Sequence, residues 1–159
     1  MKPLDHLKKL KLEYYKSRYP NVPSFAAPVP KFSDKTANGL TKCIIEYLTL
    51  EGWQAERINT MGRTIDNRKQ ITDVLGQTKT IGSTTYIPTT GTKGSADISA
   101  TVKGMSIKIE VKINDQQSDN QKKYQESIER SGGQYWLVRS FDQFYERYHN
   151  FMNGSNNNQ

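Results

Sequence analysis

Asp97-Ile-Ser-Ala-Thr-Val-Lys-Gly-Met-Ser-Ile-Lys-Ile-Glu-Val-Lys112 is the stretch of sequence that decides the fold. Two segments rich in β-branched residues, Ala96 to Val102 and Met105 to Ile113, are separated by the turn-forming pair Lys103-Gly104, which predicts a β-hairpin. In the second segment apolar residues alternate with charged ones, so the two sets point to opposite faces of a sheet. Such alternation by itself is typical of a half-buried strand with a solvated face.

The sequence on either side of this hairpin completes an α/β pattern. Periodicity and turn signals predict a helix starting with Ser33 or Asp34 as N-cap and ending at Glu51, a strand from Trp53 to Asn59, a polar loop from Met61 to Leu75, a loose hairpin from Thr78 to Pro88, a helix from Asp119 to Arg130, a strand from Tyr135 to Arg139 and a helix from Phe141 to Phe151. This order predicts a mixed central sheet flanked by helices.

The N-terminal segment is distinct from this pattern. Leu4 to Arg18 has helical periodicity, and the residues up to Tyr19 include six basic and only two acidic side chains. Four prolines between Pro20 and Pro30 then predict an extended linker. We expect a basic helical extension and linker over residues 1–33, a main domain over 34–151 and a disordered polar tail over 152–159. Two alternatives stay open for the extension, a DNA-binding arm or a packing helix.

Composition limits the classes of function. The chain has 159 residues, enough for about one domain, and its 23 basic against 16 acidic residues give a net charge of +7. Such a charge favours polyanions, of which nucleic acid is the first to consider. No apolar run approaches the roughly 20 residues of a membrane helix and no secretory segment is seen, so we expect a soluble cytoplasmic protein with no membrane partner. The single cysteine, Cys43, lies on an apolar helix stripe and excludes an internal disulfide.

The predicted hairpin carries residues suited to phosphodiester hydrolysis. Pairing across the turn can bring Asp97 to the end of the sheet where Glu110 and Lys112 emerge. Two carboxylates brought together can share a hard cation such as Mg²⁺, and a neighbouring lysine can orient the attacking water and offset charge on the phosphate. The glycines of the preceding turn, Gly91 and Gly94, allow a backbone to approach phosphate closely.

Asp97, followed after twelve residues by Glu110-Val111-Lys112, resembles the signature of the PD-(D/E)xK nucleases of the restriction-endonuclease-like fold. Five elements in order are similar to the VRR-NUC branch of that superfamily: Glu56-Arg-Ile-Asn-Thr-Met-Gly62, Gly94-Ser-Ala-Asp97, Ile109-Glu-Val-Lys112, Ser118-Asp-Asn-Gln121 and Gly132-Gly-Gln-Tyr-Trp-Leu-Val-Arg139. The resemblance implies a restriction-endonuclease-like core and a DNA endonuclease that depends on Mg²⁺ or Mn²⁺. It further implies that Asp97, Glu110 and the Val111 carbonyl bind the metal, that Lys112 lies beside the attacking water, and that Gln121 lies near the site.

One element of the family pattern is missing. The first core helix of the family usually carries a metal-supporting glutamate, and this chain has no acid at the corresponding place. Asn38 and Glu46 are the candidates to substitute for it. Candidate contacts to DNA phosphates are the basic residues near the motifs, namely Arg57, Arg63, Lys93, Lys103 and Lys108.

The resemblance also suggests a setting. Stand-alone members of the family resemble phage or mobile-element proteins, and some resolve branched DNA as homodimers, so we expect a homodimer with a preference for Holliday junctions or flaps, acting in the host-cell cytoplasm. The main alternative is a non-catalytic nucleic-acid-binding module that has kept the fold. A more remote one is a virion or scaffold protein whose basic N-terminal segment binds packaged DNA.

Overall fold

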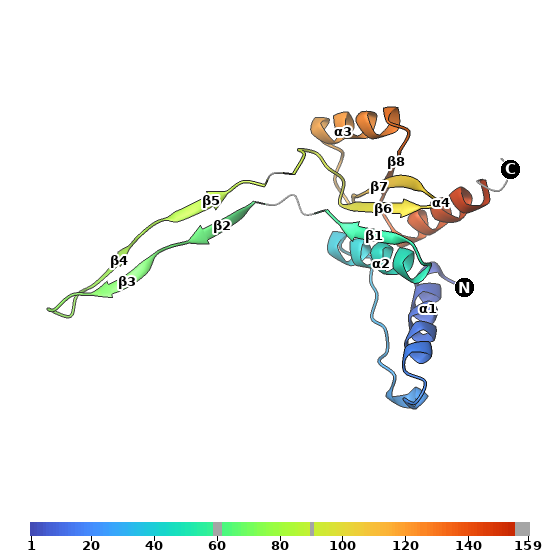
Figure 1. The fold of residues 1–159 in the computed structure, drawn as a ribbon, viewed down its shortest axis with the longest axis horizontal. Coiled ribbons are helices and arrows are strands. Elements are labelled where there is room, and N and C mark those ends of the chain that lie inside the picture. The colour runs from blue at the N-terminus through green and yellow to red at the C-terminus, as the bar shows by residue number, and fades with distance from the viewer. Residues whose placement is uncertain (59–61, 90, 155–159) are drawn as a thin grey trace.

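The protein is an α/β structure built on one mixed sheet (Figure 1). The computed structural model describes residues 1–58, 62–89 and 91–154. The sheet has the order β1-β6-β7-β8, formed by β1 (Gln54–Arg57), β6 (Ile98–Val102), β7 (Met105–Val111) and β8 (Gln134–Val138). Strand β6 runs antiparallel to both of its neighbours, β1 and β7, whereas β7 and β8 run parallel. The predicted mixed sheet flanked by helices is therefore confirmed.

Helices cover both faces of this sheet. Those on one face are α1 (Pro3–Arg18), α2 (Ala37–Leu50) and α4 (Phe141–Gly154), whereas α3 (Asp119–Arg130) lies on the other (Figure 1). A short 3-10 helix, η1 (Ser24–Ala26), interrupts the linker between α1 and α2. None of the helices in the described ranges has the length and apolar character needed to cross a membrane.

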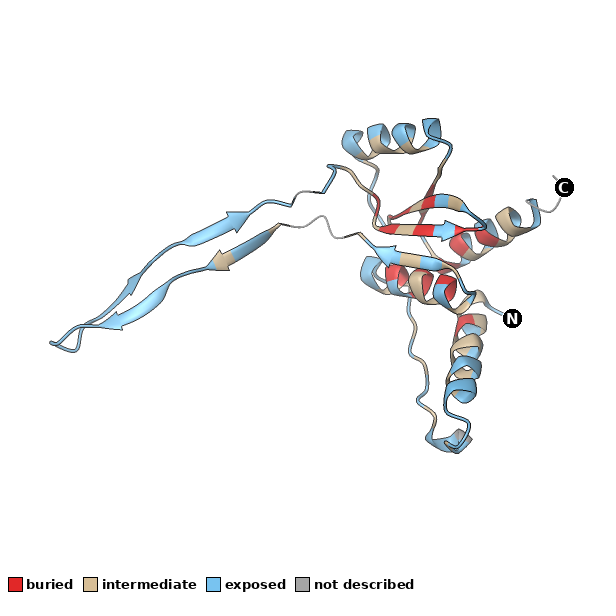
Figure 2. Cartoon of the chain, in the orientation of Figure 1, coloured by how far each residue is buried: buried red, intermediate tan, exposed pale blue. Residues whose placement is uncertain are grey.

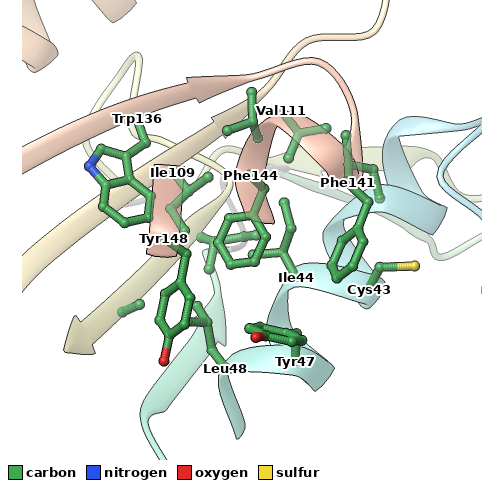
Figure 3. Packing of buried hydrophobic residues seen from close by; sticks show 14 of the residues in the cluster. Cys43, Ile44, Tyr47, Leu48, Ile109, Val111, Trp136, Phe141, Phe144 and Tyr148 are labelled. Carbon is green, nitrogen blue, oxygen red and sulfur yellow. The ribbon is translucent and has the colours of Figure 1, made fainter. Parts of the chain in front are cut away.

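The hydrophobic core lies between the sheet and α2 with α4 (Figure 3). The alternation seen in the sequence works as predicted: Ile107, Ile109 and Val111 of β7 are buried toward this core. Trp136 of β8 lies on the same face of the sheet, beside Ile109, and packs against Phe144 and other aromatic residues of α4. The charged side chains of β7 are thereby left on the face beneath α3.

Of the two alternatives for the basic extension, the structure shows that α1 packs. Leu7 is fully buried within the core cluster. The His6 Nδ1 atom lies 3.1 Å from the Tyr145 hydroxyl of α4, and Lys11 Nζ lies 2.5 Å from Glu46 Oε1 of α2. Lys2, Lys9, Lys16 and Arg18 are exposed, so most of the positive charge of the segment stays on its surface.

The predicted N-cap of α2 is wrong. Thr36 is the cap, and its hydroxyl accepts a hydrogen bond from the Gly39 amide at 3.1 Å. Asp34 instead accepts from the Phe141 amide at 3.0 Å, at the start of α4. An N-cap must precede the first helical turn directly, and Asp34 is too far from Ala37 to do so, which leaves its carboxylate available to a helix distant in sequence.

The prediction for the polar segment after β1 is also wrong. The predicted loop from Met61 to Leu75 contains β2 (Arg63–Asp66) and β3 (Lys69–Thr72), while Met61 itself lies outside the described residues. The predicted local hairpin from Thr78 to Pro88 is wrong as well, because β4 (Thr78–Ile81) pairs with β3 and β5 (Thr84–Ile87) pairs with β2. The turn lies at residues 73–77, where Asp73 Oδ1 accepts from the Leu75 and Gln77 amides, each at 2.9 Å.

These four strands form one long ribbon, residues 63–87, which we call the arm and which extends away from the body (Figure 1). Its ladder needs only backbone hydrogen bonds and buries no apolar face, so its sequence carries little of the hydrophobic signal used to predict strands. At the C-terminus α4 continues to Gly154, which makes the first residues of the predicted disordered tail helical. The rest of that predicted tail, and the predicted strand end at Asn59, lie outside the described residues.

Candidate functional site

Strand register brings Asp97 and Glu110 together. Ile98 of β6 is opposite Ile109 of β7, so Asp97, one residue before β6, meets the strand at Glu110 and Val111. The Asp97 carboxylate accepts a hydrogen bond through Oδ2 from the Val111 amide at 2.9 Å. This bond orients the aspartate toward the end of β7 and places its carboxylate beside that of Glu110.

Glu110 is the buried centre of the site, with only 2% of its surface exposed. Its Oε1 atom lies 3.2 Å from Lys112 Nζ and also accepts a hydrogen bond from the side-chain nitrogen, Nε2, of Gln121 in α3. Its Oε2 atom is buried and has no hydrogen-bond partner among the described residues. A buried carboxylate oxygen without a partner is costly, so this atom is suited to bind a ligand.

A capping box holds Gln121 in position. The Ser118 hydroxyl accepts a hydrogen bond from the backbone amide of Gln121. In return, the side-chain oxygen of Gln121 accepts one from the backbone amide of Ser118 at 2.9 Å. The side-chain nitrogen of Gln121 is then directed to Glu110. One glutamine therefore both starts α3 and fixes one oxygen of the buried glutamate.

Gly94 allows the loop before Asp97 to pass close to α3. Its φ is +81°, and a Cβ atom there would lie 2.5 Å from the backbone carbonyl group of Asn120. Only glycine satisfies both the positive φ and the close approach. The glycine of the Gly94-Ser-Ala-Asp97 motif thus brings the start of α3 against the segment that carries Asp97.

The electrostatics of the site disfavour a lone ionised glutamate. Burial is the main cause that raises the pKa of Glu110 above its ordinary value, the charge of Asp97 raises it further, and Lys112 opposes the rise only in part. Burial likewise raises the pKa of Tyr135, and Glu110 adds to that rise. A divalent cation beside the two carboxylates would reverse this balance, because it favours their ionised forms.

The residues fit such a cation through two carboxylates and a backbone carbonyl. Asp97 and Glu110 supply oxygen ligands of the kind that Mg²⁺ and Mn²⁺ prefer, and Val111 offers the neighbouring carbonyl. No cluster of three or more His, Cys, Asp or Glu side chains suited to a metal occurs in the part of the chain that the structure describes. The remaining ligands would therefore be water or phosphate oxygens, as is usual for Mg²⁺.

The structure directs both candidates for the missing helical acid elsewhere. Asn38 Oδ1 accepts a hydrogen bond at 2.8 Å from the guanidinium of Arg57, which is itself a candidate phosphate contact. Glu46 is paired with Lys11 of α1. The hydrogen bonds described for these side chains do not reach Asp97 or Glu110.

The basic candidates are divided between two ends of the molecule. Lys108 lies on the same face of β7 as Glu110 and donates to the Ser99 hydroxyl at 2.5 Å. Lys93 is exposed in the loop that leads to Asp97, and Arg63 begins the arm. Lys103 occupies the hairpin turn at the opposite end of β7, where it donates to the Met152 carbonyl at 3.1 Å, so the structure does not bring it to the site.

Sequence reasoning missed Tyr135. Its hydroxyl is buried beside the Glu110 carboxylate, and neither this hydroxyl nor Glu110 Oε2 has a partner at hydrogen-bond geometry among the described residues. The signal was present in β8: Tyr135 is opposite Lys108, so strand alternation puts it on the face that carries Glu110. It adds a second buried oxygen beneath α3, near the ring of Tyr124.

A comparison of this chain with family models, with curated proteins and with solved structures gives no match.

Proposed function

We propose that this protein is an endonuclease that hydrolyses phosphodiester bonds in DNA with the help of Mg²⁺ or Mn²⁺. One observation carries the proposal: Glu110 Oε2 is buried without a partner among the described residues, next to Asp97 and within the reach of a lysine. A purely structural glutamate at this place would be expected to have both oxygens satisfied. Two carboxylates and a lysine at one sheet edge are instead suited to phosphate chemistry.

Each residue has a role that follows from its position. Asp97 and Glu110, with the Val111 carbonyl, would hold the cation, which when bound polarises the phosphate and offsets its charge. Lys112 is 17% exposed at its side chain, so its ammonium can meet water and a phosphate from the solvent side while remaining 3.2 Å from Glu110. Gln121 keeps the glutamate in one orientation through its hydrogen bond to Oε1.

DNA is the substrate that the charge favours. The chain carries a net charge of +7, and Lys93 and Lys108 lie close to Asp97 in the loop and on the sheet face. The motif resemblance supports a restriction-endonuclease-like core of the VRR-NUC branch and, beyond it, a preference for Holliday junctions or flaps. A homodimer would supply two such sites for symmetric cleavage, and the same resemblance suggests a phage or mobile-element protein acting in the host-cell cytoplasm.

A non-catalytic DNA-binding module is the second candidate. The observation in its favour is that the first core helix offers no acid to the site: Asn38 binds Arg57, and Glu46 binds Lys11. Such a module would bind the same DNA in the presence of a divalent ion and leave it intact.

The test incubates the full chain with linear, flapped and four-way DNA in Mg²⁺, Mn²⁺ or EDTA. We expect cleavage with either ion, none in EDTA, and none by Asp97→Asn, whereas Asp115→Asn, at an exposed loop residue, keeps the wild-type rate. Lys112→Ala should lower the rate steeply and leave ion binding almost unchanged. Cleavage in EDTA, or by Asp97→Asn at the wild-type rate, would overturn the mechanism, and binding without cleavage would establish the second candidate. Cleavage of linear duplex alone would remove the junction preference.

A further inference from the structure

The arm is exposed along its whole outer length. Every residue of β3, β4 and β5 is exposed, and Figure 2 shows the ribbon standing clear of the buried core. An isolated two-stranded ribbon is only marginally stable in water, so such an arm is expected to gain order from a partner. The side chains on its two faces indicate the chemistry of that partner.

The arm keeps one register from base to tip. Asp66 is opposite Thr84 and Lys69 is opposite Ile81, with the Asn67 amide donating to the Ser83 carbonyl between them. Directly opposed residues of an antiparallel pair lie on the same face, and successive residues of a strand alternate between faces. Every pair in the arm joins two odd-numbered or two even-numbered residues, so the odd-numbered residues share one face and the even-numbered residues share the other.

The two faces differ sharply in chemistry. The odd-numbered face, which we call the basic face, has no acid among its strand residues and carries three cations and four isoleucines: Arg63, Lys69, Lys79, Ile65, Ile71, Ile81 and Ile87. On the even-numbered face the one acid and the one cation neutralise each other, since Asp66 holds Arg68 through two hydrogen bonds of 2.9 and 2.8 Å. The other side chains of that face are mostly threonines.

Three of the four isoleucines of the basic face, Ile71, Ile81 and Ile87, are exposed, and Ile65 is partly buried. Ile71 and Ile81 are 49% and 50% exposed, and each is directly opposite a lysine of the other strand, Lys79 and Lys69 respectively. Exposed β-branched residues on one face, mixed with cations and with no acid on the strands, fit a partner that offers both negative charge and apolar contact. Duplex DNA is such a partner, because phosphates line the edges of the major groove and thymine methyl groups project into it.

We propose that the arm binds duplex DNA by lying in the major groove with its basic face toward the bases; DNA as the ligand rests on the function proposed above. The major groove is wide enough for a two-stranded ribbon. From Arg63 to Thr72 the strand rises by about 30 Å, close to the roughly 34 Å of one helical turn. Lys69 and Lys79 reach the phosphates on either side, and Ile71 and Ile81 contact base edges between them.

The position of the arm in the chain links DNA binding by the arm to the candidate site. The arm leaves the body after β1 and returns to the loop that carries Lys93 and Asp97. DNA bound to the arm is therefore held next to the chain segments that position Asp97. The arm would therefore set which part of a duplex or branch reaches Asp97.

The first test compares two neighbouring residues of opposite faces. Binding of the full-length protein to a fluorescent duplex is measured by anisotropy in EDTA over a range of salt concentrations. Removing one cation that touches a phosphate lowers the steepness of log K against log salt by about 0.9, so we expect that fall for Lys69→Gln and about twice that fall when Lys79→Gln is added. Arg68→Gln removes the same charge one residue away on the other face and should change the slope much less.

The second test probes the apolar contact through the DNA. A duplex with uracil in place of thymine lacks the methyl groups, and we expect the wild type to bind it several-fold more weakly than the thymine duplex. In Ile71→Thr/Ile81→Thr this difference should disappear.

Three results of these binding measurements would overturn the proposal. They are an equal fall in slope for Arg68→Gln and Lys69→Gln, no fall for either, and equal binding of the two duplexes by the wild type. A change in sedimentation on arm substitution with DNA binding unaltered would also overturn it, since the arm would then join copies of the chain. Because binding is measured in EDTA, failure of the arm and failure of cleavage are seen separately: a protein that never cuts DNA can still show the Lys69 effect, and an active nuclease can lack it.

Discussion

Replacing Glu110 by glutamine is expected to stabilise the fold without divalent ions and to destabilise it, relative to the wild type, when they are present. The glutamate is 2% exposed, and burial and Asp97 together outweigh the favourable charge of Lys112. Glutamine keeps an oxygen that can accept from Gln121 and removes the buried charge. Lys112, which is 17% exposed, can turn to water when its partner is neutral.

The size of the effect follows from the general cost of a poorly paired buried charge. We expect Glu110→Gln to gain about 1 kcal/mol in EDTA, the lower end of the cost of an unsatisfied buried polar group, which raises the Tm by roughly 2–4 °C in a chain of this length. The wild type should lose stability as the pH rises from the ordinary pKa of a glutamate to the raised pKa of Glu110, because the unfolded chain has then released a proton that the folded chain still holds. The variant should lack this slope.

Divalent ions should reverse the order of the two proteins. At a free ion concentration of about a hundred times the Kd, binding to the folded state alone adds about 2.7 kcal/mol, or roughly 5–10 °C. We expect this rise for the wild type with Mg²⁺ or Mn²⁺, and little or none for the variant. Glu126→Gln, at an exposed position of α3, is the control and should follow the wild type in both conditions.

Differential scanning calorimetry in EDTA and in Mn²⁺ measures both effects. A variant that is less stable than the wild type in EDTA would mean that Lys112 and Gln121 satisfy Glu110 well, and would refute the claim that its charge is poorly paired. Equal stabilisation of both proteins by the ion would mean that the cation binds elsewhere.

The remaining predictions concern contacts that join distant parts of the chain. Leu7→Ala should lower the free energy of unfolding by about 2–5 kcal/mol, because Leu7 is fully buried in the core, whereas Leu12→Ala on the same helix should cost much less. Urea unfolding measures both losses, and equal losses would mean that α1 does not pack as described. Asp34→Ala should cost about 1 kcal/mol, seen as a lower Tm, because it removes the acceptor for the Phe141 amide at the start of α4. Asp34→Asn keeps an acceptor oxygen and should cost less, and an equal loss in the two would contradict this capping role.

Local pattern was enough to predict most of the sheet and one side of the site. The alternation of β7, the Lys103-Gly104 turn and the bounds of α3 all depend on residues within a few positions of one another, and the structure agrees with each. The pairing of Asp97 with Glu110 follows from the same short hairpin, because the turn fixes the register. These features are determined by sequence alone since their interactions are short-range.

Other features depend on which distant segments meet, and only the tertiary structure decides that. Proximity in sequence assigns Asp34 to the nearest helix, yet it caps one that begins more than a hundred residues later. The strands after Thr78 pair back along the arm rather than with each other, because a backbone ladder between polar strands leaves almost no trace in hydrophobicity. The orphan oxygen of Glu110 likewise exists only because α3 closes over β7 and excludes water, and burial by another element is a property that no local spacing contains.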